Sequence, residues 1–196
     1  MSDFLKHIGK LAAKGDSLER TIVPTRVLQF DADFACYEAA DLEEPVAKNF
    51  QELIKLVNRR RTLVGAALVN NFLTLGDKSG RNHIATIKPY QDNRDPDAPI
   101  KVRVRELRKL LAVYADHNMK AIPSWTMEAD DMMCREQETM IRCGRRDDSI
   151  LMSGDKDLWM VQGIHADAKT GRIWDVNGYG RTEYREVGNV KPKLVG

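Results

Sequence analysis

The sequence of 196 residues contains four short apolar runs that each end in acidic residues. The runs are residues 27–30, 72–76, 121–123 and 150–152. Runs this short and this apolar are typical of buried strands in a parallel sheet. The carboxyl ends of such strands meet at one edge of the sheet, where open α/β folds place their functional sites. The sequence therefore predicts an α/β fold with acids gathered at one edge of a parallel sheet.

Four clusters of carboxylates follow these runs. They are Asp31 with Asp33, Asp77, Glu128 with Asp130 and Asp131, and Asp155 with Asp157. Any one cluster is compatible with a helix N-cap or a turn, but all four follow the end of a predicted strand. So many acids at one edge would repel one another strongly unless divalent cations lay between them. The joint pattern therefore favours a site for Mg²⁺ or Mn²⁺.

Two divalent cations about 3.5–4 Å apart, held by carboxylates, are the standard device for phosphodiester hydrolysis. Other chemistries lack a motif, because the sequence contains no G-x-x-x-x-G-K-[ST] phosphate loop, no G-x-G-x-x-G and no G-x-S-x-G. The histidines show no ligand spacing. Metal-dependent hydrolysis is the chemistry that the acids favour.

Basic residues are grouped, although the net charge is only +2. The groups lie at residues 59–61, 101–105, 108–109 and 145–146. An acidic centre with basic surroundings suits a metal-dependent enzyme that acts on a polyanion, although any one basic run is also compatible with a solvated helix face.

Cysteine usage and the absence of targeting segments predict a cytoplasmic protein. The three cysteines are widely spaced and form no C-x-x-C pair, which argues against a disulfide framework and a structural zinc site. The sequence contains no apolar stretch long enough to span a membrane and no signal peptide at its start.

Amphipathic spacing predicts three long helices. The first begins at Pro45, the second passes through Leu107 and the third runs from about Glu128 to Cys143. Residues 78–100 are polar and rich in turn residues, which is typical of a functional or disordered loop. The expected buried positions are Val46, Phe50, Leu53, Ile54 and Val57 in the first helix and Val104, Leu107, Leu111 and Tyr114 in the second, and a hairpin is expected over residues 164–166 and 172–176.

Five motifs resemble the 5′-nuclease superfamily in their order and spacing. They are Phe30-Asp31-Ala32-Asp33, Leu75-Gly76-Asp77-Lys78, Tyr90-Gln91-Asp92-Asn93-Arg94, Met127-Glu128-Ala129-Asp130-Asp131 and Ser153-Gly154-Asp155-Lys156-Asp157. The superfamily includes bacteriophage 5′–3′ exonucleases, flap endonucleases and the 5′-nuclease domain of bacterial DNA polymerase I. The resemblance implies a PIN-like three-layer sandwich, α/β with a mostly parallel central sheet, over residues 25–180. Residues 1–24 would then be an N-terminal arm or helix, and residues 78–110 a helical gateway or arch-like insertion.

The resemblance also implies an activity: a 5′–3′ exonuclease or flap endonuclease of phage type, acting in DNA replication in the host cytoplasm with two Mg²⁺ or Mn²⁺ ions in the complete enzyme. Family metal ligands carry over to Asp31, Asp77, Glu128, Asp130, Asp131, Asp155 and Asp157, of which Asp31, Asp77, Asp130 and Asp155 are the expected catalytic residues. The implied partner is DNA with 5′ ends, flaps or single strands, and a preference between DNA and RNA stays open.

The DNA-binding residues expected from the resemblance and from the basic runs are Lys88, Tyr90, Arg94, Lys101, Arg103, Arg105 and Arg108. Two departures from the family stand out. Gln91 occupies the place of a phosphate-steering lysine. In addition, the family continues into G-D-x-x-D-N-I and a helix–hairpin–helix DNA-binding module about where residues 181–196 lead. We expect a chain that is incomplete by itself, for which a separate C-terminal polypeptide is one candidate partner.

Two alternatives stay open at the level of sequence. A haloacid-dehalogenase-like phosphatase also has D-x-D after its first strand, but its motif usually carries Thr or Val where this chain has Ala35. A non-catalytic or split-subunit nucleic-acid-binding protein would keep the core and need a second polypeptide. Activity on a small phosphate monoester rather than an oligonucleotide would distinguish the first alternative, and the downstream coding sequence would distinguish the second.

Overall fold

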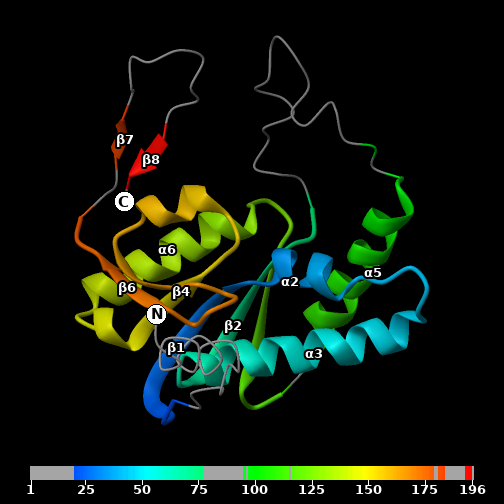
Figure 1. Cartoon of the computed structure of the whole chain (residues 1–196), viewed down its shortest axis with the longest axis horizontal. Coiled ribbons are helices and arrows are strands. Elements are labelled where there is room, and N and C mark those ends of the chain that lie inside the picture. The colour runs from blue at the N-terminus through cyan, green and yellow to red at the C-terminus, as the bar shows by residue number, and fades with distance from the viewer. Residues whose placement is uncertain are drawn as a thin grey trace, which may run out of the picture.

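The protein folds as an α/β sandwich around one central sheet (Figure 1). The computed structural model describes residues 20–76, 95, 97–114, 116–178, 181–183 and 193–195. The sheet has six strands in the order β3-β2-β1-β4-β5-β6, and all neighbouring pairs are parallel except β5 with β6. The α/β class and the mostly parallel sheet expected from the sequence are thus confirmed.

The strands of the sheet are β1 (Val23–Asp31), β2 (Ala66–Thr74), β3 (Met119–Ser124), β4 (Ser149–Met152), β5 (Gly163–Ala166) and β6 (Ile173–Val176). The helices are α2 (Ala32–Ala39), α3 (Val46–Leu63), α5 (Pro99–Val113) and α6 (Ala129–Arg142), with short 3₁₀-helices η1 (Arg146–Asp148) and η2 (Lys156–Met160). A separate antiparallel pair joins β7 (Arg181–Glu183) to β8 (Lys193–Val195).

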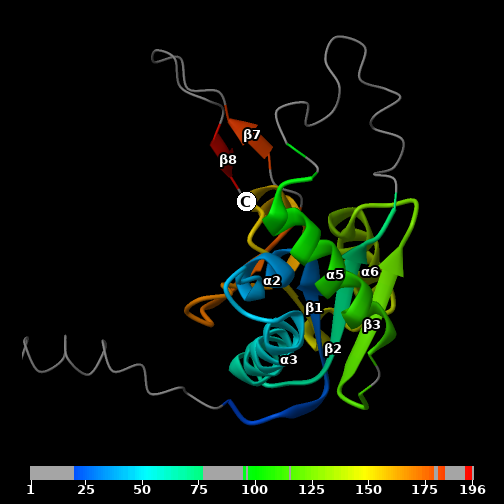
Figure 2. The ribbon, with the colours of Figure 1, turned by 90° about the vertical axis from the view of Figure 1, so that its right-hand side faces the viewer.

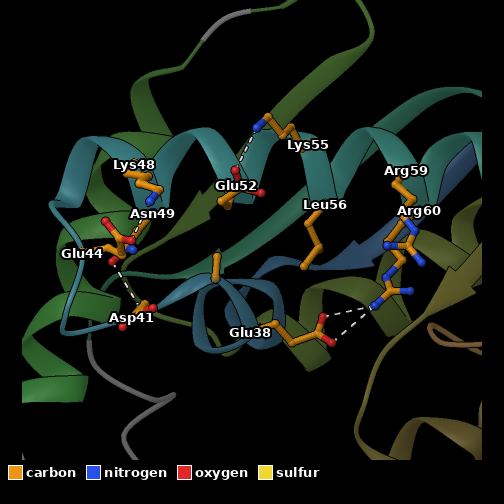
Figure 3. Close-up of a pocket in the computed structure, with 11 residues that line it drawn as sticks. Glu38, Asp41, Glu44, Lys48, Asn49, Glu52, Lys55, Leu56, Arg59 and Arg60 are labelled. Carbon is orange, nitrogen blue, oxygen red and sulfur yellow. Dashed lines mark hydrogen bonds and ion pairs between the residues drawn. The ribbon is translucent and has the colours of Figure 1, made fainter.

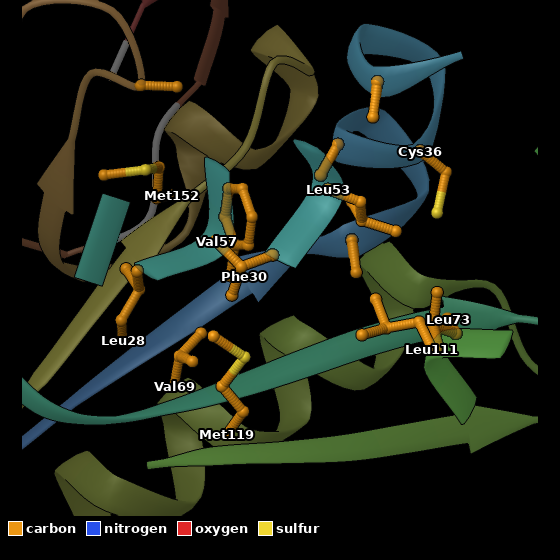
Figure 4. Close-up of a cluster of buried hydrophobic side chains, with 14 of the residues drawn as sticks. Leu28, Phe30, Cys36, Leu53, Val57, Val69, Leu73, Leu111, Met119 and Met152 are labelled. Carbon is orange, nitrogen blue, oxygen red and sulfur yellow. The ribbon is translucent and has the colours of Figure 1, made fainter. Parts of the chain in front are cut away.

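Helices cover both faces of the sheet, with α2, α3 and α5 on one face and α6 on the other (Figure 2). Successive residues of a strand point to opposite faces. Leu28 and Phe30 therefore enter the larger core, which Figure 4 shows together with Leu53 and Val57 of α3. A smaller apolar layer lies on the α6 face of the sheet and includes the buried residues Phe72, Met133 and Leu151.

The predicted helices and hairpin are present. Leu53 and Val57 of α3 are buried, as are Val104, Leu107 and Leu111 of α5. Helix α6 begins at Ala129 with Glu128 as its N-cap, and Gly144 beyond its end adopts the left-handed conformation (φ 71°) that stops helices. The expected hairpin is the antiparallel pair β5 and β6.

Strands β2 and β4 begin before their apolar runs, and buried polar residues are among the added positions. Gln29 of β1 accepts a hydrogen bond from Nδ2 of Asn70 of β2 at 3.0 Å and donates through Nε2 to Oγ of Ser149 of β4 at 3.2 Å. The Ser149 hydroxyl donates in turn to Oε1 of Gln137 of α6 at 2.6 Å. We call these four residues the polar row. It lies on the α6 face and links three strands to one helix.

Most of the expected N-terminal arm and about half of the expected gateway lie outside the described residues. Residues 1–19 of the expected N-terminal arm lie outside the described residues, as do residues 78–94 of the expected gateway. The described end of the gateway belongs to α5, and within the expected tail the described residues form β7 and β8. Among the described residues, no helix is both long and apolar enough to cross a membrane.

Helix α5 allows a matched test of the core. Leu111 is 1% exposed, whereas Val113 on the same helix is 80% exposed. Leu111→Ala should lower the free energy of unfolding by about 2–5 kcal/mol, because it removes buried methyl groups and leaves a cavity. Val113→Ala should change it by less than about 0.5 kcal/mol. Urea denaturation followed by circular dichroism measures both, and equal effects would contradict the placement of α5.

Candidate metal centre

The carboxyl ends of β1, β2 and β4 and the start of α6 meet at one edge of the sheet. Asp31 is the last residue of β1, and Asp155 follows β4. Asp130 lies in the first turn of α6 and experiences the negative charges of Asp31, Asp155 and Glu128. The structure therefore brings acids from three of the four predicted clusters together, and Asp77 of the fourth lies outside the described residues.

Asp31 is a buried carboxylate fixed by two hydrogen bonds. One of its oxygens accepts from the backbone N–H of Phe34 at 3.0 Å, which caps helix α2, and the other accepts from the Ser153 hydroxyl at 2.7 Å. Burial raises the pKa of Asp31 to about 6, although both hydrogen bonds favour the ionised form and lower it. Asp31 is thus oriented from the loop after β4 as well as from its own helix.

Asp130 has a strongly perturbed carboxyl group. Its pKa is raised to about 7, first by burial and then by the charges of Asp31, Asp155 and Glu128 in that order. An ionised carboxylate in this position faces the negative charge of its neighbours. A divalent cation would supply the compensating positive charge, so the electrostatics of the edge fit a metal site.

The type and the spacing of the possible ligand atoms also determine whether this edge can bind a metal ion. The donors are carboxylate oxygens, which Mg²⁺ and Mn²⁺ prefer. In the described ranges, no three His, Cys, Asp or Glu side chains could hold an ion between them. Mg²⁺ usually keeps several water ligands and binds through one or two protein carboxylates together with substrate phosphates. An edge with one or two well-placed carboxylates can therefore hold such an ion.

Thr74, at the end of β2, connects the acid clusters. Its hydroxyl accepts from the backbone N–H of Ala129 at 2.9 Å, and its own N–H donates to Asp33 at 3.1 Å. The N-cap residue Glu128 makes no capping hydrogen bond with its side chain. The start of α6 is therefore capped from β2. Sequence reasoning missed this role, because Thr74 lies inside an apolar run and nothing in the pattern marks it.

The loop after β4 lies close against α2. Gly154 has no room for a side chain, because a Cβ there would lie 2.8 Å from the ring of Phe34. Asp155 is exposed, caps η2 by accepting from the N–H of Asp157 at 2.9 Å, and donates its own N–H to Ser153 at 3.0 Å. Ser153 thus holds both Asp31 and Asp155, a role that its place in the motif could have signalled.

The two remaining predicted ligands lie nearer to solvent. Asp157 is exposed, and Asp131 lies half-buried in the first turn of α6.

Two of the expected DNA-binding arginines are engaged inside the protein. Arg108 forms an ion pair with Asp33 at 2.8 Å, and its guanidinium lies 5.9 Å from the centre of the Tyr37 ring. Arg103 donates to the backbone carbonyls of Asp41 at 2.7 Å and Glu44 at 2.6 Å. Both side chains attach α5 to the core.

The other expected DNA-binding residues fall into two groups. Lys101 is half-buried, and Arg105 is exposed with a long ion pair of 3.8 Å to Asp97. Lys88, Tyr90 and Arg94 lie outside the described residues. On α5, Arg105 is therefore the expected cation that the structure leaves exposed, and Lys101 has no ion pair with another described residue.

A pocket of about 610 Å³ lies between α2 and α3, apart from the acidic edge (Figure 3). Its charges are largely paired: Lys48 with Glu44 at 2.5 Å, Lys55 with Glu52 at 2.8 Å and Arg60 with Glu38 at 3.3 Å. None of the predicted site residues lines it.

Comparisons with known proteins identify the fold. No family model matches the chain, and no curated protein matches it. Solved structures do match it, among them two T5 structures. The T5 D15 protein co-crystallised with metal ions is 14% identical with a TM-score of 0.56, over 80% of this chain and 58% of that one. The T5 5′-exonuclease with divalent zinc bound is 15% identical with a TM-score of 0.54, over the same shares.

The chain shares the fold of the T5 5′-exonuclease. The fold expected from the sequence resemblance is thereby confirmed. The chain spans 58% of the length of these proteins. At 14% and 15% identity, the likeness shows the fold alone.

The raised pKa of Asp130 predicts that Asp130→Asn stabilises the metal-free protein. A carboxyl whose folded pKa is about 7 against 3.8 ordinarily binds its proton more tightly when folded, so stability falls as pH rises through that window. The side-chain amide of asparagine carries no charge, so the variant avoids this loss of stability. At pH 8 the variant should be more stable by about 1–3 kcal/mol, with the difference vanishing toward pH 4.

Urea denaturation in EDTA at both pH values measures this effect. Asp147→Asn, an exposed acid outside the cluster, is the matched control and should have little effect at either pH. A variant at position 130 that is less stable than the wild type at pH 8 would show that Asp130 does not face a net negative field.

Proposed function

We propose that this chain is the catalytic domain of a divalent-metal-dependent 5′ nuclease that hydrolyses DNA phosphodiesters. The observation that carries the proposal is the position of Asp130, a carboxyl with a pKa raised to about 7 among Asp31, Asp155 and Glu128, at the functional edge of a 5′-nuclease fold. The similarity to metal-bound exonuclease structures supports metal dependence. Mg²⁺ or Mn²⁺ is the proposed cofactor.

The proposed metal ligands are Asp31, Asp77, Glu128, Asp130, Asp131, Asp155 and Asp157, with Asp31, Asp77, Asp130 and Asp155 nearest the chemistry. Two bound ions would supply an activated water and stabilise the charge of the leaving oxygen. The chain's own part is to hold the acids in place. Phe34 and Ser153 fix the oxygens of Asp31, and Thr74 fixes the start of α6. Such prior positioning lowers the reorganisation that the reaction requires.

The proposed substrate is DNA with a 5′ end, a flap or a single-stranded segment. The acidic edge repels phosphates by itself, so phosphate attraction must come from bound cations and from basic side chains nearby. Lys101 and Arg105 of α5 are the described candidates among the expected residues. Lys88, Tyr90 and Arg94 are proposed to contribute as well, as the sequence indicated.

The phosphatase alternative fits the geometry less well. It requires the second acid of the Asp31-x-Asp33 pair to act on substrate. Asp33 instead forms an ion pair with Arg108 at 2.8 Å and accepts from the N–H of Thr74 at 3.1 Å. A carboxylate engaged in this way serves the fold, which favours the nuclease.

A cleavage assay tests the proposal. The wild-type chain should shorten 5′-labelled single-stranded, nicked or flapped DNA in Mg²⁺ or Mn²⁺ and not in EDTA. Asp130→Asn should lower the rate by about 10²–10³, the usual cost of losing one such electrostatic contribution. Asp147→Asn, which keeps the cluster intact, should retain the wild-type rate.

Two results would overturn the proposal. Hydrolysis of p-nitrophenyl phosphate without any cleavage of DNA would point to a phosphatase. Binding of DNA without cleavage in either metal would point to a non-catalytic nucleic-acid-binding protein.

The internal contacts of α5 predict which cations bind phosphates. The logarithm of DNA affinity should fall linearly with the logarithm of salt concentration, and Lys101→Ala or Arg105→Ala should reduce that slope by about 0.7–0.9 for each phosphate that the side chain neutralises. Arg108→Ala should instead lower the melting temperature, since it removes the ion-pair partner of Asp33. Fluorescence anisotropy in Ca²⁺ measures the slopes, with Lys55→Ala on α3 as the control. An unchanged slope in both α5 variants would exclude this helix as a phosphate-binding element.

A further inference from the structure

Trp125 is a tryptophan that the fold leaves in solvent. It directly follows β3, and 65% of its surface is exposed. Tryptophan contributes one of the largest apolar surfaces of any side chain, and most of it is normally buried. The other exposed large apolar residues come from different elements, for example Leu42 before α3 and Val113 on α5. Trp125 therefore stands apart from any apolar patch formed by its own loop.

The backbone around Trp125 is held in place by hydrogen bonds. The N–H of Leu75 donates to the carbonyl of Ser124 at 2.7 Å, which joins the end of β2 to the end of β3. The Ser124 hydroxyl accepts from the N–H of Thr126 at 3.3 Å and of Met127 at 2.9 Å. The indole is therefore exposed on a braced turn rather than on a free loop.

Trp125 lies at the same edge of the sheet as the candidate metal centre. Gly76 packs so closely against the Trp125 backbone that a Cβ at position 76 would lie 2.2 Å from the Trp125 carbonyl oxygen. Gly76 directly precedes Asp77, and Trp125 comes three residues before Glu128. Figure 2 shows β2 and β3 side by side with their carboxyl ends at the same edge. Trp125 thus lies at the carboxyl edge of the sheet, three residues before the acid cluster that begins at Glu128.

We propose that Trp125 is a stacking platform for a nucleobase of the strand being cleaved. The inference rests on the proposed nuclease function and adds an interaction with the base rather than the phosphate. The metal ions proposed for this edge would hold a phosphate, and the base attached to that phosphate would need an apolar surface within one nucleotide. An indole face meets this need for any base, since every base offers a π-face. The stacking would position the strand without selecting a sequence.

An abasic oligonucleotide separates stacking from phosphate binding. The probes are a fluorescein-labelled decathymidylate and an abasic phosphodiester of the same length, both in Ca²⁺. Trp125→Ala should weaken binding of decathymidylate by about 5- to 100-fold, the range that follows from the usual stacking contribution per base. It should leave the affinity for the abasic oligomer unchanged. Trp125→Phe should restore most of the affinity.

Trp159→Ala is the matched control. Trp159 is 40% exposed and contacts the ring of Trp174 edge-to-face, with ring centres 6.1 Å apart, so it shares the residue type but has an aromatic partner. Its removal should leave the affinity for both oligomers unchanged. Thermal melting of each variant checks that the fold is retained, and decathymidylate should quench the tryptophan fluorescence of the wild type more than that of Trp125→Phe.

The outcomes separate this inference from the nuclease proposal. Equal weakening of both oligomers in Trp125→Ala, or no weakening of either, would overturn the stacking role even if the chain cleaves DNA. Quenching by decathymidylate and a weakening confined to that probe would support stacking even if no cleavage is seen. Failure of the wild type to bind either oligomer would overturn the stacking role as well.

Discussion

The arrangement of the acids at the sheet edge depends on the hydrogen bonds of Thr74. Its backbone N–H holds Asp33 and its hydroxyl caps helix α6, so one residue at the end of β2 fixes the first turns of two helices that carry acids. Asp33 in turn pairs with Arg108 of α5. Four elements therefore meet through one short chain of polar interactions. Each interaction gives a modest net stabilisation, but leaving a buried partner unsatisfied is costly, so the set persists together or fails together.

The acids themselves work against stability. Burial raises the pKa values of both Asp31 and Asp130, and each acid also experiences a neighbouring negative charge. The apolar layer around Phe72, Met133 and Leu151 lies on the α6 face of the sheet and offsets this repulsion. A protein with repulsion concentrated at one edge is stabilised by any cation that binds there, because such a cation binds the folded state alone.

The sequence predicted the parallel strands, the buried faces of α3 and α5 and the N-terminal position of Glu128 in α6, because those features follow from periodicity and local signals. It did not predict what the side chains contact. Arg108 and Arg103 were expected to bind DNA, and nothing in the sequence indicated that they also contact Asp33 and backbone carbonyls of the protein. A basic run shows that a helix is positively charged, but it does not show which residues the basic side chains contact. Contacts between distant segments leave no local pattern in the sequence. For the same reason, the sequence could not predict that Thr74 caps helix α6.

The polar row has a consequence for the alignment of the strands. Side chains alternate across a sheet, so a slip by one residue would turn Gln29, Asn70 and Ser149 toward the apolar core of the opposite face. Their hydrogen bonds would be broken inside the protein, at a cost of about 1–3 kcal/mol for each group left unsatisfied. Asp31 lies two residues beyond Gln29, and Thr74 and Ser153 lie four residues beyond Asn70 and Ser149. The row therefore holds three strand ends in register, and the spacing of the carboxylates depends on hydrogen bonds between residues buried inside the sheet.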